Sequence, residues 1–377
     1  MSSWLARIPA VKEHLRLPLG VLGAVLLSAA AGAVVAMPIT SQLVSRFGSA
    51  RLTQFTTALL CLAVMLPPLS ISAVTLAFAL FFYGASAGAM DVSMNTQAVE
   101  VEAGIGRPVM VSFHALFSIG GMIGALLGSV AARYGIGPAL NLGVVGLAMA
   151  VFAALFVSRL VPDRRDHSPV EQSAREFLRP LIGLGIVAFC ILLGEGAMAD
   201  WSAVYLSQLS GPAVAPLGYA VFSMMMALGR LGGDWFHEHL GSVATVRFGS
   251  GLAAIGLAGA LTIGNTAATL VGFGLVGCGF SAIFPIVCSV AGANAGGRPQ
   301  AGIAAVSMTG YLGFLIGPPL IGFLAQAFSL RIGLGLVAVM SGVTTILAGI
   351  VRPPSPSLGG LDAAGADPLD TAQRFEA

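Results

Sequence analysis

A short polar stripe interrupts an otherwise apolar stretch of the chain near position 90. Gly84, Gly88, Asp91 and Asn95 follow one another at spacings of four, three and four residues, so a helix would carry all of them on one narrow face. A carboxylate at the centre of a membrane costs about 2.5 to 3.5 kcal/mol on insertion scales, so this face should turn toward a polar cavity. Asp91 is therefore a candidate proton or substrate site, and an interhelical hydrogen-bonding anchor is the alternative.

A second carboxylate, Glu195, lies near the middle of another apolar stretch, where an acid is a candidate for loading and releasing a proton. Asp200 follows five residues later, about 140° around a helix, so the two acids should not line the same face. We expect Asp200 and Trp201 nearer the outer mouth of a pathway. Trp201 either belongs to that pathway or anchors the helix at the membrane interface.

His114 lies about five residues into the apolar stretch that follows Asp91, at a similar depth on an antiparallel neighbour. A hydrogen bond between the two would make a proton-responsive pair. A histidine that only fills a packing gap is the alternative. Between the two stretches, three charged residues form either a cytoplasmic gate or a solvated loop: Glu100, Glu102 and Arg107.

Several patterns resemble catalytic, cofactor-binding or metal-binding motifs, but their surroundings in the sequence do not suit those functions. Gly272, Gly274 and Gly277 match a dinucleotide-binding spacing, but they lie inside an apolar stretch without strands around it, which indicates helix packing. His237 and His239 would point to different faces of a helix. The four cysteines have neither metal-site nor disulfide spacing. We therefore expect no enzyme activity, no cofactor and no metal site.

The composition places these side chains in a membrane. Hydrophobic residues make up 56% of the chain and charged residues only 9%, whereas ordinary globular proteins carry about a quarter charged residues. The 50 glycines suit close packing between membrane helices. With a net charge of +2 and Lys12 as the single lysine, the chain has no basic surface for nucleic acid.

Eleven apolar stretches are long enough to cross a bilayer, which requires about 20 residues. They span residues 19–43, 52–71, 74–95, 109–132, 138–157, 180–206, 216–236, 244–263, 268–290, 302–325 and 332–351. Loops that carry most of the arginines alternate with loops that carry few, so the arginine-rich side should be cytoplasmic. This places the C-terminus in the cytoplasm.

The charged segment 159–179 divides the chain into two helix bundles. The N-terminal bundle covers residues 1–158 and the C-terminal bundle residues 180–351, and a disordered cytoplasmic tail follows over 352–377. Landmarks of the first bundle recur in the second at a nearly constant offset. The offset is 193 for Gly48-Ser49 and Gly241-Ser242, Gly84 and Gly277, Gly120 and Gly313, and Gly124 and Gly317, and 191 for Gly106-Arg107-Pro108 and Gly297-Arg298-Pro299.

The repeat implies a helix that the first bundle lacks. The stretch 180–206 needs a counterpart before Leu19, and Ser3-Trp4-Leu5-Ala6 resembles only its end, Asp200-Trp201-Ser202-Ala203. We therefore expect a complete protein of twelve helices, six in each half. The present chain would start near the outer end of the first helix, through a mis-called start codon or a real truncation.

Together with the helix count, the linker and the repeat, several motifs resemble the major facilitator superfamily of transporters. They lie at residues 91–97, 99–102, 106–108, 195–201 and 311–319, and they resemble a poorly characterised bacterial inner-membrane branch that is distantly similar to the proton-coupled fucose symporters. One superfamily signature departs from its pattern, because Ser45 replaces the acidic residue before Arg46. The Gly-Pro pair of drug antiporters is absent at Gly124-Ala125.

The resemblance implies an all-α membrane protein with the major facilitator fold, two pseudo-symmetric six-helix bundles, the first missing its first helix. It also implies a monomeric secondary transporter that moves a small solute by alternating access. Acids inside the membrane point to protons as the coupling ion, and few intramembrane cations point to a neutral, sugar-like solute. A non-transporting sensor or scaffold with the same fold, and an efflux antiporter, are the alternatives.

Overall fold

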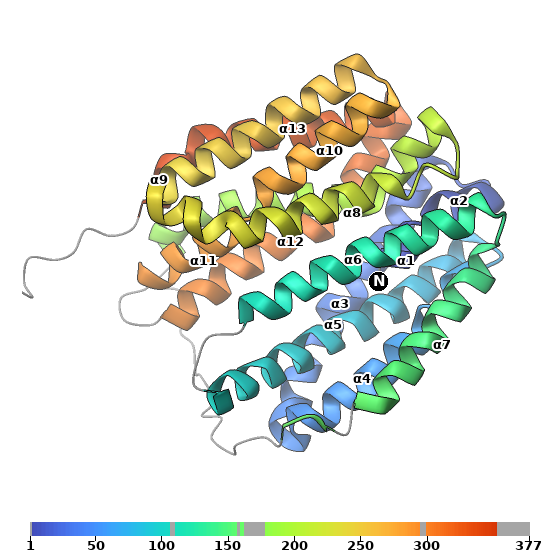
Figure 1. Cartoon of the computed structure of the whole chain (residues 1–377), viewed down its shortest axis with the longest axis horizontal. Helices are drawn as coiled ribbons and strands as arrows, with labels where there is room; N and C mark the ends of the chain where they lie inside the picture. The colour runs from blue at the N-terminus through green and yellow to red at the C-terminus, as the bar shows by residue number, and fades with distance from the viewer. Residues whose placement is uncertain (1, 106–109, 157–158, 162–177, 295–298, 353–377) are drawn as a thin grey trace, which may run out of the picture.

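The computed structural model describes residues 2–105, 110–156, 159–161, 178–294 and 299–352, and the regular structure within these ranges is helical (Figure 1). The α-helices are α1 (Ser2–Leu5), α2 (Ile8–His14), α3 (Leu19–Phe47), α4 (Ser49–Ala63), α5 (Ala73–Ile105), α6 (Met110–Arg133), α7 (Pro138–Phe156), α8 (Leu178–Ser210), α9 (Leu217–Ile263), α10 (Thr266–Phe280), α11 (Ile283–Ala293), α12 (Pro299–Ala327) and α13 (Leu330–Leu347). Two 3-10 helices, η1 (Pro67–Leu69) and η3 (Ala348–Val351), accompany them. The predicted all-α fold is confirmed.

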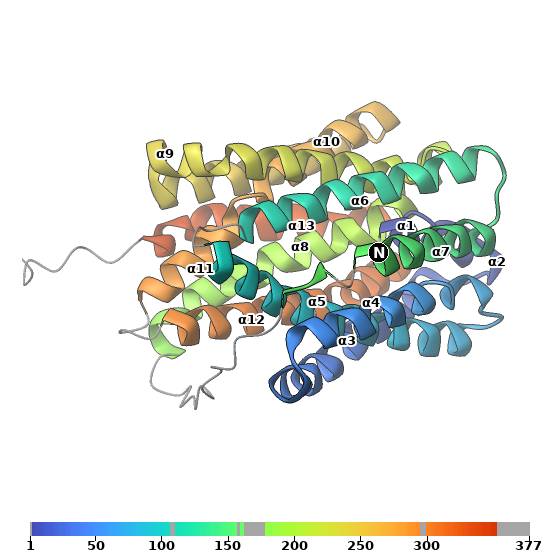
Figure 2. The ribbon, with the colours of Figure 1, turned by 60° about the horizontal axis from the view of Figure 1, so that its bottom comes forward.

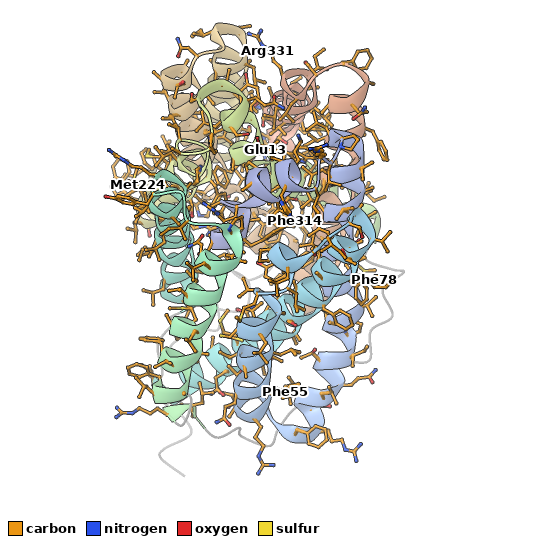
Figure 3. All side chains as sticks on the ribbon, turned by 90° about the vertical axis from the view of Figure 1, so that its right-hand side faces the viewer. Glu13, Phe55, Phe78, Met224, Phe314 and Arg331 are labelled. Atoms are coloured by element: carbon orange, nitrogen blue, oxygen red, sulfur yellow. The ribbon has the colours of Figure 1, made fainter. Side chains whose placement is uncertain are left out.

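Helices long and apolar enough to cross a membrane make up most of the described chain. Nine spans satisfy length and hydropathy together. The sequence predicts eleven; among the described residues, Ile119–Arg133 of α6 is a shorter apolar helix, and most of α9 before Gly241 lies outside the nine spans. Phe55 and Phe78 lie at the periphery in Figure 3 and are 64% and 65% exposed, as side chains facing lipid would be.

Two predicted span boundaries differ from the structure. The stretches 216–236 and 244–263 both belong to α9, which changes direction sharply at Gly241, where φ is 75° and ψ is 165° (Figure 1). Only glycine adopts such a backbone readily. The stretch 268–290 divides into α10 and α11, which meet between Phe280 and Ile283.

The internal repeat reappears as matching contacts. Gly84 of α5 packs against the carbonyl oxygen of Ala29 in α3, and Gly277 of α10 packs against that of Phe222 in α9. Ala29 and Phe222 are 193 positions apart, as Gly84 and Gly277 are. The repeat therefore preserves a contact between two helices as well as single glycines. Gly48, with φ 89° and ψ 151°, has nearly the same backbone as Gly241.

The bundle has two ends that the following sections refer to by fixed names. The α2 end carries α2, the end of α6 and the start of α9, and the linker end carries the end of α7 and the start of α8 (Figure 2). At the α2 end, α3 meets α12, where the Gly20 backbone N–H donates to Oε1 of Gln326 at 3.3 Å. There too α6 meets the connection between α8 and α9, where the Ser129 hydroxyl donates to the Ala213 carbonyl at 3.1 Å.

The N-terminal segment is packed into this end of the bundle. The Ser3 hydroxyl donates to the carbonyl of Gly124 at 3.2 Å. Arg7, which is only 4% exposed, donates to the carbonyl oxygens of Gly128 and Ile136 at the end of α6. An arginine that satisfies the last carbonyls of a helix stabilises that end, since those groups lack partners within the helix.

Candidate functional site

A central cavity of about 340 Å³ lies where the helices of the two repeats face each other. Its walls come from α1, α3 and α5 with α6 on one side, and from α8, α9 and α12 on the other. This volume suits a small solute. Phe314, near the middle of the bundle in Figure 3, is one of several aromatic side chains in the wall. The polar lining residues are Ser2, Tyr83, Glu195, Asp200, Tyr219, Ser223, Arg230 and Tyr311.

Both acids of α8 line this one cavity, although the helical spacing predicts that Glu195 and Asp200 lie on different faces of the helix, with Asp200 nearer an outer mouth. Gly196 and Ala199 line it as well, so α8 presents a broad arc rather than a stripe. The prediction assumed a narrow polar face. A cavity whose opposite walls lie on α5 and α9 can instead wrap around more than a third of a helix.

Arg230 of α9 is the cationic residue among the described lining side chains. Its charge acts on Glu195 and on Tyr219, which places the three groups within electrostatic reach of one another. Sequence reasoning missed Arg230. The available signal was an arginine inside the apolar stretch 216–236, because a cation at that depth is as costly as an acid.

Three hydroxyl groups meet beside α6. The Tyr219 hydroxyl is hydrogen-bonded with the side chains of Ser2 and Ser223. All three lie over Gly121, where an added methyl group would meet the Ser223 oxygen at 2.7 Å and the Ser2 oxygen at 3.2 Å. This cluster joins α1, α6 and α9 in the wall of the cavity. The lack of a side chain at Gly121 is what admits it.

Asp91 and Asn95 do not line the cavity, although Gly84 of the same stripe does. The Asn95 amide donates to Oδ1 of Asp91 at 3.1 Å, so the two form a pair along α5. Gly84 and Gly88 pack against α3, which gives the glycine part of the stripe a packing role. Asp91 lies about two turns beyond Gly84 toward the linker end and acts electrostatically on Tyr311, a lining residue.

Trp201 is fully buried, with 0% of its surface exposed, so an anchor at the lipid interface does not fit it. Glu100 is also buried, at 6%, rather than solvated. Near it, Ser49 donates to Oε1 of Gln97 at 3.2 Å, and the Gln97 amide donates to the carbonyl of Val161 at 2.9 Å. The side chains of His114 and Glu102, and the whole of Arg107, lie outside the described residues.

His237 and His239, which the sequence predicts on different faces of a helix, have different partners. Nε2 of His237 hydrogen-bonds with the Ser242 hydroxyl at 2.9 Å, and His239 stacks on Trp235 with ring centroids 4.4 Å apart. Gly272 and Gly277, from the apparent dinucleotide spacing, pack against the backbones of Gly256 and Phe222. These contacts agree with helix packing.

The model of the Major Facilitator Superfamily matches residues 2–301. This chain belongs to the Major Facilitator Superfamily. An uncharacterised MFS-type transporter of Yersinia pestis is 36% identical over 90% of this chain and 89% of its own length. An uncharacterised transporter of Sinorhizobium fredii is 32% identical over 93% and 94% of the two chains. The membrane protein MosC of Rhizobium meliloti is 32% identical over 90% and 84%.

Solved structures agree on the fold. A point mutant of the nucleoside transporter NupG superposes with a TM-score of 0.74 at 13% identity, over 93% of this chain and 94% of that one. A bacterial homologue of the human lysosomal transporter Spinster, in an inward-facing and occupied conformation, gives 0.71 at 13% identity with the same coverage. The chain is thus a membrane transport protein with the major facilitator fold, and not an enzyme.

Proposed function

We propose that this chain is a proton-coupled secondary transporter that carries a small, hydroxyl-bearing solute such as a sugar into the cell. The observation that carries the proposal is the central cavity, in which Glu195 and Asp200 lie between two repeated sets of helices. Such a position is where transporters of this architecture bind their solutes. The hydroxyls of Ser2, Tyr219 and Ser223 supply hydrogen-bonding partners for hydroxyl groups of a solute.

Alternating access follows from how the repeats meet. The two helix bundles, divided by segment 159–179, would rock about the cavity, exposing it to one side at a time. Contacts of α3 with α12, and of α6 with the connection that leads into α9, support a state that is sealed at the α2 end. Solute entry from that side requires these contacts to separate.

Protons are the coupling ion because acids lie in or beside the cavity. Glu195 lines it, and Asp91, within electrostatic reach of the lining residue Tyr311, lies on its linker side. One proton that moves inward across about 150 mV releases roughly 3.5 kcal/mol, enough for a solute gradient of a few hundredfold. Transport driven in this way needs no ATP.

The linker end faces the cytoplasm of a bacterial inner membrane in this proposal. Arg46, Arg51 and Arg159 are exposed at that end, as positively charged cytoplasmic loops are. Arg7, at the α2 end, is buried against a carbonyl oxygen of α6, so we leave it out when the exposed positive charges of the two ends are compared. The C-terminus, after Arg352, then lies in the cytoplasm.

The test uses proteoliposomes with a pH-sensitive dye in the lumen, exposed to a panel of sugars and other small solutes. We expect at least one solute to acidify the lumen. Glu195→Gln or Asp91→Asn should abolish acidification while radiolabelled counterflow of that solute continues, and Glu238→Gln, which removes an exposed acid of α9, should change neither. Normal acidification in both cavity-side variants would refute the coupling. Absence of counterflow for every solute would favour the sensor or scaffold alternative.

A further inference from the structure

The two acids of α8 have different surroundings. Glu195 lies within reach of the Arg230 guanidinium. For Asp200, the described residues supply neither a hydrogen-bond donor nor a cation, and Tyr83 of α5 lies within its electrostatic reach. Both carboxyl groups line the same cavity, so the difference lies in their partners rather than in their depth.

The described lining residues therefore include one more acidic side chain than basic side chains. Glu195 and Asp200 contribute two carboxylates and Arg230 one guanidinium. A carboxylate removed from water without a partner is costly, and the surrounding wall is mostly apolar and aromatic. A cationic group of a bound solute would restore the balance, and aromatic faces such as those of Trp4 and Tyr83 also favour a cation.

We propose that the transported solute carries a positively charged nitrogen, a protonated amine or a quaternary ammonium group, and that Asp200 binds it. This inference rests on the proposed transport function and narrows its substrate class. Glu195, beside Arg230, then remains the proton site. The hydroxyls of Ser2, Tyr219 and Ser223 contact the polar remainder of the solute.

Other solute classes fit the cavity less well. A neutral sugar would supply no cationic group to Asp200. An anionic solute would meet two carboxylates, while Arg230 already interacts with Glu195. A charge-assisted hydrogen bond to a cationic nitrogen is among the stronger non-covalent contacts, and it would form where the described protein offers no donor.

The experiment compares solutes of equal shape and different charge. Choline is paired with 3,3-dimethyl-1-butanol, in which carbon replaces the charged nitrogen, and glucosamine is paired with glucose. Dissociation constants are measured by titration on the purified protein in nanodiscs, where Trp4, a lining residue, supplies a fluorescence signal. In at least one pair we expect the charged member to bind about tenfold tighter or more than its neutral counterpart.

Variants assign that preference to one side chain. Asp200→Asn should remove it, Asp200→Glu should restore part of it, and Glu238→Gln should leave it unchanged. Thermal unfolding of each variant establishes that it is folded. Equal binding within both pairs, or a preference that survives Asp200→Asn, would overturn the inference. Counterflow of glucose without binding of either cation would also overturn it and would leave the proposed transport function in place. If none of the four probes shows counterflow, but the tighter binding of the charged solutes depends on Asp200, the result would support the binding site and refute the proposed transport function.

Discussion

The seal at the α2 end depends on a close approach between Gly23 of α3 and α12. A methyl group added at Gly23 would lie 2.6 Å from the carbonyl oxygen of Pro318, 3.0 Å from Cα of Gly322 and 3.2 Å from Cα of Pro319. All three are backbone atoms, which cannot turn aside as a side chain can. Overpacking of this kind costs about 1 to 3 kcal/mol. If only the sealed state contains this contact, Gly23→Ala should lower the ratio of sealed to open molecules by about 5- to 150-fold.

The assay measures access to the cavity from each side of the membrane. The chain first has its four cysteines, Cys61, Cys190, Cys278 and Cys288, replaced. A single cysteine then replaces Ala199, a half-buried lining residue, and reacts with a membrane-impermeant maleimide in intact cells and in inverted vesicles. With the α2 end outside, Gly23→Ala should speed labelling in intact cells only.

Gly20→Ala is the matched control one turn earlier on α3. Its added methyl group would lie 3.4 Å from the side chains of Gln326 and Phe323, an ordinary contact with atoms that can move. Its labelling rates should equal those of the unmodified protein. Equal labelling of the Gly20→Ala and Gly23→Ala proteins from both sides would show that the seal does not depend on this approach, and the reasoning would fail.

Substitutions at five further positions test the fold. Gly84→Ala and Gly277→Ala should each reduce the stability by about 1 to 3 kcal/mol, because the added methyl group would meet a backbone carbonyl oxygen at both positions. The thermal unfolding midpoint should therefore fall by a similar amount in the two variants, and unequal decreases would contradict the repeat. Gly335→Ala, with no described atom near its added methyl group, should be neutral or slightly stabilising in the same thermal scan. Gly241→Ala should cost about 1 to 2 kcal/mol, since φ there is 75°; an unchanged midpoint would contradict that strain. Arg7→Met should lower the midpoint by removing two charged hydrogen bonds, and Arg7→Lys should lower it less.

The sequence predicts the spans and the repeat because both are local properties. A membrane helix satisfies its own backbone hydrogen bonds, so length and apolarity almost suffice to identify it. The repeat is visible because glycine at a close approach tolerates no substitute. Gly84 and Gly277 keep their places for the same reason, a neighbouring carbonyl oxygen.

Which residues line the cavity depends on which helices pack beside one another, and the sequence does not give that packing. Helical spacing predicted that Glu195 and Asp200 would separate, yet the walls around α8 leave both open to one space. Helical spacing also predicted that the face carrying Asp91 and Asn95 would turn toward a polar cavity, yet neither residue lines the central cavity. The cluster at Gly121 unites residues more than 200 positions apart in sequence, which no single pattern could reveal.

Glycine has two separate roles in this fold, and the difference bears on how the protein could move. Gly84 and Gly277 lock neighbouring helices within one repeat, α5 on α3 and α10 on α9. Gly23 and Gly121 instead lie where helices of different repeats meet, beside α12 and α9. Rocking of two rigid bundles requires the first kind of contact to persist while the second separates. An added methyl group should therefore reduce stability at Gly84 and shift the balance between sealed and open states at Gly23.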